Sequence, residues 1–520
     1  MAEMDSRIKG KDIVIWGIGV LQSDLEGILS LRNILYYVDD DFQEENTIIV
    51  SGDSVYSSEK LKDERRENLL VIICTDYQDD AIAKLKTMGY KEENYILGQE
   101  LLADASFYHE ICAREISIWG TGRMYSLNED EIHQYLPEIT RFIVTEKREN
   151  TFQGKEVLSF REVKERGLST YVVVASAYYK EIYRSLTDSG MCSGRDFIHL
   201  ETFLVMCSLS KGIDGEFQFD DRKRDLENLL VVLAGYKEFV WGSVFQRLKA
   251  FVPENIDVCV VTSGLVNTDL RQMCETFGWS YMSTIKNHVS LALNLVISNH
   301  PRAKYIYKMD EDIFLTEGVF EVLKETYQRV QAESRYEVGF VTPLIPVNGY
   351  GYVRLLEIFG AVKLWEERFG ELKYTIALQH HRTIQRDPEA ARFMWGEENQ
   401  AMESLDKIQK ELRKKEFQYS ICPIRYSIGF ILFHRDNWIN MGSFPVAARN
   451  LGIDEEALCK FCMMESRAMV VAENAVVGHL AYNPQNKEME QYYYSHKEKF
   501  QLTIKDREEQ ETGSCDEAGQ

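Results

Sequence analysis

Short runs of β-branched and aliphatic residues that end in glycine recur along the chain. Residues 13–19 read IVIWGIG, and residues 116–122 read ISIWGTG. Each run has the length of a buried strand, and the apolar residues after it have helical spacing. A buried strand, a glycine turn and a helix form the start of a βαβ unit, so both segments predict parallel sheets.

These two segments belong to a longer repeat. Residues 72–90 and 173–191 also read alike, and in both pairs the copies lie about a hundred positions apart. A period of this size indicates duplicated domains rather than a solenoid, whose repeats have roughly 20–50 residues. We therefore expect two Rossmann-like modules, 1–106 and 107–208.

The glycine turns match the dinucleotide-binding fingerprint only in part. Gln22 stands where copy one should have the third glycine, and Tyr125 stands there in copy two. Asp39, Asp40 and Asp41 lie about 20 residues beyond Gly19, where a ribose-binding acid belongs. We expect the modules to serve docking, homo-oligomer formation or acceptor recruitment. A nucleotide-dependent oxidoreductase or epimerase is the alternative, and NAD bound to the purified protein would favour it.

A second set of predicted strands follows a polar, charge-rich segment, 209–227, which we expect to be a linker. LLVVLAG (229–235) and IDVCVVTSG (256–264) are buried strands followed by helical patterns. A later strand, AKYIYKMDEDIF (303–314), runs directly into acidic residues. Open parallel sheets bind ligands at the carboxyl ends of their strands, so we expect the ligand site among these acids.

The acids at the end of this strand suit a divalent cation. Alternate residues of a strand point to the same side, which lets Asp310 and Asp312 converge while Glu311 faces the other way. Mg²⁺ and Mn²⁺ prefer a few carboxylates together with substrate phosphates. A solvated acidic turn is the alternative explanation.

Three features together resemble a GT-A glycosyltransferase over roughly residues 228–480. The first is the acidic triplet 310–312, which matches the D-x-D motif of that fold. The second is GIDEEAL (452–458), similar to the acidic motif that supplies a base in inverting members. The third is GHLAYN (478–483), where His479 matches a late histidine of the metal shell. The WGxG modules resemble those attached to bacterial sugar-modifying enzymes.

The resemblance implies an α/β chain with two tandem Rossmann-like parallel-sheet modules followed by a GT-A type domain. That domain would cover residues 228–500, with an acceptor-side insertion at about 346–420 and a disordered acidic tail at 501–520. Its activity would be transfer of a sugar from a nucleotide-sugar donor, with a UDP-sugar favoured, to a hydroxyl of a glycan, lipid-linked or protein acceptor. Bacterial surface glycan or glycoconjugate assembly would be the setting. A non-catalytic scaffold of a glycan assembly complex is a further alternative.

The resemblance also assigns roles to residues. Asp312, Asp310 and His479 would hold Mn²⁺ or Mg²⁺. In an inverting mechanism Glu455 would be the catalytic base, with Asp454 beside it as the other candidate, whereas a retaining mechanism would need no such base. An acid-rich helix start is the alternative explanation of these acids. The predicted donor-binding residues are Gly235, Tyr236, Thr262, Ser263, Asn287, Asn294 and Glu311.

Composition narrows the partners. The 520 residues include 60 basic and 83 acidic ones, for a net charge of −23. Nucleic-acid binding needs clustered Lys and Arg, so this balance argues against it. A phosphate-bearing ligand stays compatible, because a metal cation can bridge two anions.

Cysteine content and hydropathy indicate a compartment. Ten cysteines at irregular spacing do not form a secreted disulfide framework. The first twelve residues lack the apolar core of a signal peptide, and no apolar run approaches the 18 residues of a membrane span. We expect a cytoplasmic protein, with a peripheral position at the inner membrane face as the variant.

Overall fold

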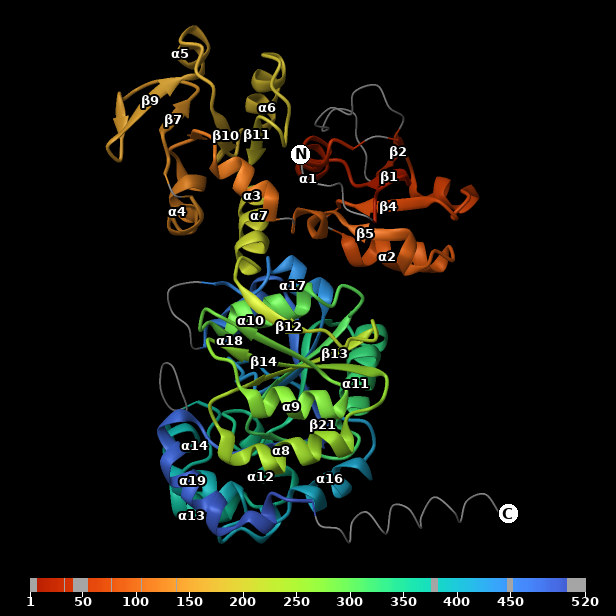
Figure 1. Cartoon of the computed structure of the whole chain (residues 1–520), viewed down its shortest axis with the longest axis vertical. Coiled ribbons are helices and arrows are strands. Elements are labelled where there is room, and N and C mark those ends of the chain that lie inside the picture. Colours follow the sequence, from red (N-terminus) through yellow and green to blue (C-terminus); the bar gives the residue numbers. More distant parts are fainter. Residues whose placement is uncertain are drawn as a thin grey trace. The chain divides into compact units, whose positions relative to one another are not determined.

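The computed structural model describes residues 7–31, 33–40, 55–75, 77–103, 105–136, 138–375, 382–446 and 452–502. The chain divides into two compact units, Met1–Asp214 and Gly215–Gln520 (Figure 1). Within the described residues, no helix combines the length and the apolar character needed to cross a bilayer. Of the predicted acidic tail, all but Gln501 and Leu502 lies outside the described residues.

Copy one of the repeat is a parallel five-stranded sheet in the order β3-β2-β1-β4-β5. Its strands are β1 Asp12–Trp16, β2 Ile34–Val38, β3 Val55–Tyr56, β4 Leu69–Ile73 and β5 Tyr95–Leu97. Its α-helices are α1 Val20–Leu29, α2 Gln78–Thr87 and α3 Ala105–Cys112. The glycine-turn strand β1 therefore lies in the middle of the sheet, between β2 and β4, as in a doubly wound sheet.

Copy two repeats this order around β6, with strands β11-β10-β6-β7-β9-β8. Its strands are β6 Ile116–Trp119, β7 Arg141–Val144, β8 Thr151–Phe152, β9 Lys155–Ser159, β10 Tyr171–Val174 and β11 Phe197–His199. Its helices are α4 Arg123–Tyr135, α5 Phe160–Glu165, α6 Tyr179–Thr187 and α7 Leu200–Gly212. All neighbours are parallel except the β8–β9 hairpin, so the predicted parallel sheets are present in both copies.

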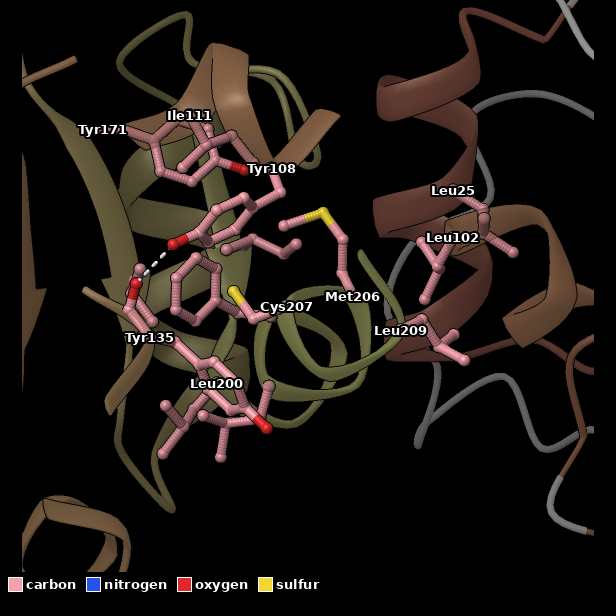
Figure 2. Close-up of a cluster of buried hydrophobic side chains, with 14 of the residues drawn as sticks. Leu25, Leu102, Tyr108, Ile111, Tyr135, Tyr171, Leu200, Met206, Cys207 and Leu209 are labelled. Atoms are coloured by element: carbon pink, nitrogen blue, oxygen red, sulfur yellow. Dashed lines mark hydrogen bonds between the residues drawn. The ribbon is translucent and has the colours of Figure 1, made fainter. Parts of the chain in front are cut away.

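The two copies share a hydrophobic core in which α7 is central. Met206 and Cys207 of this helix pack among copy-two residues, whereas Leu209 lies beside Leu25 and Leu102 of copy one (Figure 2). The apolar residues of α7 are buried around most of its circumference, the pattern of a helix enclosed by its neighbours. The duplicated modules therefore form one compact unit.

The second unit is built on a nine-stranded mixed sheet in the order β12-β15-β14-β13-β16-β20-β18-β21-β19. Its strands are β12 Phe217–Asp220, β13 Asn228–Ala234, β14 Ile256–Ser263, β15 Ser280–Thr284, β16 Tyr305–Asp310, β18 Glu337–Leu344, β19 Tyr419–Ile421, β20 Phe430–His434 and β21 Arg467–Val476. Strands β15, β14, β13 and β16 are parallel neighbours, which places their carboxyl ends at one edge. The predicted α/β fold class is confirmed.

Helices follow the strands of the second unit as the apolar spacing predicts. Those in its first half are α8 Glu238–Phe251, α9 Thr268–Phe277, α10 Val289–Ser298 and α11 Val319–Glu333. The later ones are α12 Gly351–Ile358, α13 Val362–Phe369, α14 Arg382–Arg386, α15 Pro388–Met394, α16 Leu405–Arg413, α17 Arg435–Asn440, α18 Ile453–Met464 and α19 Asn486–Ser495. The short strands β17 Ile313–Phe314 and β22 Gly478–His479 form a separate antiparallel pair.

The segment predicted as a linker, 209–227, is not one throughout. It begins with the end of α7, and Phe217–Asp220 form β12, which pairs antiparallel with β15. The sequence FQFD alternates aromatic and polar residues, and this period suits a strand at the edge of a sheet. The strand was not predicted because the residues on both sides of it are rich in charge, which is typical of a linker.

Candidate active site

A cavity of about 760 Å³ opens at the carboxyl ends of β13, β14 and β16. It is lined by these residues predicted from the sequence: Tyr236, Ser263, Asn287, Asp310, Glu311, Asp312, Asp454, Glu455 and His479. Lys237, Lys308 and Arg425 line it as well. Of the predicted site residues, Gly235, Thr262 and Asn294 are not among its lining.

Strand β16 carries a lysine and an aspartate to the cavity on the same side. Lys308 and Asp310 are two residues apart, and Lys308 Nζ lies 2.7 Å from Asp310 Oδ1. The same ammonium donates to the carbonyl oxygen of Ile428 at 2.8 Å. Burial raises the pKa of Asp310, and the positive charge of Lys308 opposes that rise.

Asp312 lies just beyond β16 and is almost fully buried. Lys237 Nζ donates to its Oδ2 at 2.6 Å, and His479 Nε2 lies 3.4 Å from the same oxygen. Burial acts to raise the pKa of Asp312, but Lys237 and His479 outweigh it, so the pKa is lowered and the carboxylate is the stable form.

Pairing between two short strands brings His479 to this position. Ile313 of β17 is the register partner of His479 in β22. The His479 Nδ1 lies 3.0 Å from the carbonyl oxygen of Val347, which can only accept, so Nδ1 carries the proton in the neutral ring. Nε2 faces Asp312 Oδ2, where a protonated ring adds the positive charge that favours the carboxylate, and where the lone pair of a neutral ring can bind a metal.

These residues fit a divalent cation that is shared with a ligand. In the described part of the chain, no three His, Cys, Asp or Glu side chains are arranged as a complete metal site. Asp312 and His479 nevertheless present a carboxylate oxygen and an imidazole nitrogen to each other, with Asp310 nearby. Mg²⁺ usually takes one or two protein carboxylates and completes its shell with phosphates and water. A cation held with donor phosphates therefore suits this donor set.

Glu311 fixes the turn between β13 and α8. Its carboxylate accepts hydrogen bonds from the backbone N–H of Gly235 at 2.9 Å and of Tyr236 at 3.0 Å. It also accepts from Trp241 Nε1 at 2.7 Å. Gly235 has φ 136°, a value that side chains disfavour, and this conformation turns both N–H groups toward the acid. Gly235 and Glu311 thus position Tyr236.

Tyr236 stands at the cavity rim with 61% of its surface exposed. Its hydroxyl donates to the carbonyl oxygen of Ser263 at 2.6 Å, which fixes the ring. Asn287 lines the same part of the cavity. A fixed, exposed aromatic ring beside polar groups is suited to stacking on a planar base.

Two residues predicted to bind the donor are interior residues instead. Asn294 is fully buried, accepts from Trp438 Nε1 at 2.9 Å and donates to the carbonyl oxygen of Phe444 at 2.7 Å. Helix α10 is buried on all sides, so its polar position faces a neighbouring loop rather than the cavity. Thr262 is likewise buried and donates to the carbonyl oxygen of Leu265 at 2.7 Å.

Ser263 lines the cavity, but its hydroxyl is hydrogen-bonded to the backbone. Its Oγ accepts from the backbone N–H of His288 at 2.7 Å and so ties β14 to the start of α10. The hydroxyl of Ser263 is therefore already engaged.

The acids at the start of α18 have different environments. Arg425 Nε donates to Glu455, and Arg425 Nη1 donates to Glu456 at 3.0 Å. Burial raises the pKa of Glu455, and Arg425 opposes the rise. Asp454 is buried, and its Oδ2 lies 3.9 Å from Lys308 Nζ. Lys308 therefore faces both Asp310 and Asp454.

Sequence reasoning missed the four cationic side chains that line this cavity, Lys237, Lys308, Arg386 and Arg425. Lys308 had a signal, because it precedes Asp310 by two residues on the same strand. Lys237 follows the glycine turn directly, which also places it at a strand's carboxyl end. Arg425 lies in a loop and carried no comparable signal.

No protein-family model matches this chain, and no curated protein matches it. Among solved structures it is similar to the crystal structure of GalNAc-T7 with UDP, GalNAc and Mn²⁺, at 11% identity and a TM-score of 0.29. The match covers 50% of this chain and 45% of that one, so it spans less than half of that protein. A likeness of this size says nothing about activity.

Proposed function

We propose that the second unit, Gly215–Gln520, is a glycosyltransferase that uses a nucleoside-diphosphate sugar. One observation carries the proposal. Three groups of residues that are far apart in the sequence line one cavity at the carboxyl ends of parallel strands: the acids 310–312 at the end of β16, His479, and Asp454 with Glu455 at the start of α18. Ligands of open α/β sheets bind at this edge.

The diphosphate would bind beside Asp312, His479 and Lys237. Mn²⁺ or Mg²⁺ held by Asp312 and His479, with Asp310 nearby, would supply positive charge to the departing diphosphate. Lys308 adds fixed positive charge to a cavity lined by five carboxylates, and Lys237 lies beside Asp312. Such charges stabilise a leaving group best when they are already in position. Tyr236 would stack on the base.

Glu455 would deprotonate the acceptor hydroxyl. The hydroxyl proton passes to the Glu455 carboxylate while the acceptor oxygen bonds to the anomeric carbon. The bond from that carbon to the diphosphate oxygen breaks, and the nucleoside diphosphate leaves with the electron pair. Burial raises the pKa of Glu455, which makes its carboxylate a better base, and Arg425 holds it in place.

The test is a nucleotide-release screen with UDP-, GDP-, dTDP- and CMP-sugars, offered with glycan, lipid-linked and protein acceptors. We expect release with one donor class, a UDP-sugar first, in Mn²⁺ or Mg²⁺, and loss of release in EDTA. Release that persists in both EDTA and the Asp312→Asn variant would sink the metal assignment. Absence of release and of nucleotide binding across the panel would favour the scaffold alternative.

A further inference from the structure

We propose that Lys237 occupies the cation site in the free protein and yields it when a diphosphate arrives. The divalent cation and the nucleotide would then bind cooperatively. This inference rests on the proposed function, because it requires a diphosphate ligand in the same cavity.

The first step is the position of the ammonium group. Lys237 Nζ lies 2.6 Å from Asp312 Oδ2, and this is the oxygen that His479 Nε2 faces at 3.4 Å. The Asp312 side chain is only 4% exposed, so few other directions are open to a cation. The ammonium therefore satisfies the carboxylate that a metal would use.

The second step is mutual exclusion. Mg²⁺ binds oxygen at about 2.0–2.1 Å. A metal on Asp312 Oδ2 would then lie within about 5 Å of the Lys237 ammonium in its present place, and two cations repel strongly at that distance when buried. Binding of a metal to Asp312 thus requires Lys237 to move.

The third step is the freedom of Lys237 to move. Its side chain is 21% exposed, and among the described residues its ammonium donates a hydrogen bond to Asp312 alone. Its backbone follows the turn that Glu311 anchors, so only the flexible stem has to swing. A diphosphate in the cavity would give the ammonium a new anionic partner.

Lys308 shows the opposite behaviour and makes the assignment specific. It is 4% exposed, donates to the carbonyl oxygen of Ile428 and lies 2.7 Å from Asp310. These contacts hold its ammonium in place. Only one of the two lysines is therefore built to exchange with a metal.

Cooperativity follows from this exchange. A diphosphate that draws Lys237 away frees Asp312 for the metal, and a bound metal frees Lys237 for the diphosphate. The coupling between two binding equilibria is reciprocal, so each ligand raises the affinity of the other by the same factor.

The experiment measures Mn²⁺ binding to the full chain by electron paramagnetic resonance of free Mn²⁺, with and without UDP, GDP or dTDP. We expect weak binding to the wild type alone and at least about tenfold tighter binding with the diphosphate that the protein accepts. Lys237→Met should bind Mn²⁺ about tenfold tighter without nucleotide, and its gain from nucleotide should shrink. Lys237→Arg should keep the weak binding, since it keeps the charge.

Lys324→Met is the matched control, because Lys324 pairs with Glu227 and Asn228 and is not among the residues that line the cavity. It should bind Mn²⁺ as the wild type does. If a nucleotide binds but Lys237→Met shows unchanged or weaker Mn²⁺ affinity, this inference is overturned while the proposed function stands. If none of the three diphosphates binds, both fail.

Discussion

The glycine turns of the two units all follow a buried strand, but the space beside the glycine differs between the units. A side chain at Gly17 would come within 2.4 Å of the backbone nitrogen of Thr75, and one at Gly120 within 2.3 Å of the carbonyl oxygen of Ala175. At Gly235 the nearest atoms are 3.5 Å away, on Leu265 and Thr262. The glycine turns of the first unit therefore pack directly against the end of the neighbouring strand. The turn at Gly235 in the second unit has space for side chains beside it.

Strand register shows which residues lie beside the glycine turn in each unit. In copy one, Ile15 pairs with Ile72 of β4, and in the second unit Leu233 pairs with Asp310 of β16. β4 and β16 each lie parallel to the glycine-turn strand, on the side opposite to the next strand in the chain. The acids 310–312 thus occupy the places that Ile72, Ile73 and Cys74 hold in copy one. The backbone arrangement is shared, and the residues at one strand end decide whether it can carry chemistry.

In copy one, a backbone N–H group of the glycine turn is hydrogen-bonded within the module. The backbone N–H of Ile18 donates to Asp39 Oδ2 at 3.1 Å. In a dinucleotide site this region of the turn faces the pyrophosphate, and the acid binds the ribose. Here the acid binds the turn, which weighs against the oxidoreductase or epimerase alternative.

The largest expected effect separates the two strand ends directly. Asp312→Asn should reduce kcat/KM for sugar transfer by at least about a hundredfold, since it removes the carboxylate that would hold the cation facing the diphosphate. Cys74→Ala, at the corresponding place in copy one, should leave kcat/KM unchanged. Equal losses in both variants would mean that the two places do not differ in function.

The next effect concerns the base. Glu455→Gln should lower kcat by about 10²–10⁴-fold with little change in the donor KM, because it removes the proton acceptor. Asp454→Asn is the matched variant one residue away. If Glu455→Gln transfers sugar normally while Asp454→Asn does not, Asp454 is the base.

The first unit uses a buried acid for structure, and pH should reveal this. Asp24 in α1 accepts from Ser193 Oγ at 2.6 Å and from the backbone N–H of His199 at 3.2 Å, and burial raises its pKa to about 7. The folded state then binds more protons than the unfolded state between the unfolded pKa, near 4, and pH 7. Stability is therefore greatest below about pH 4 in respect of this group, and falls as pH rises toward 7.

Hydrogen exchange at pH 5 and pH 7.5, corrected for intrinsic rates, measures this effect in the full chain. Protection of α1 and α7 should fall by at most about 3 kcal/mol between these values. Asp24→Asn should flatten the dependence. An unchanged slope in that variant would contradict the role of Asp24.

The smallest effect concerns the base-stacking side of the cavity. Tyr236→Ala should raise the donor KM about tenfold, because stacking on an aromatic ring contributes about 1–3 kcal/mol. Tyr236→Phe keeps the ring and should change KM by less than about threefold. Tyr178→Ala removes an exposed tyrosine of the first unit and should have no effect.

Local sequence patterns predicted many of the strands and turns of the fold. The runs at 13–19, 116–122 and 229–235 all form a strand and a turn, because a short apolar run and the glycine that ends it are signals contained in adjacent residues. The neighbouring acids 310–312 needed no tertiary information to be placed together. The strand at 217–220 was missed, since its pairing with β15 is made by residues more than sixty positions away.

The sequence by itself determined the parallel sheets, their duplication and the acids at one strand end. Only the tertiary structure decided that His479 meets Asp312, through the pairing of β17 with β22, and that Asn294 turns inward. It alone placed Lys237 on Asp312. The physical reason is that side-chain alternation and turn residues act over a few positions. Contacts across a cavity depend on which distant strands pair, and only the packed chain settles that.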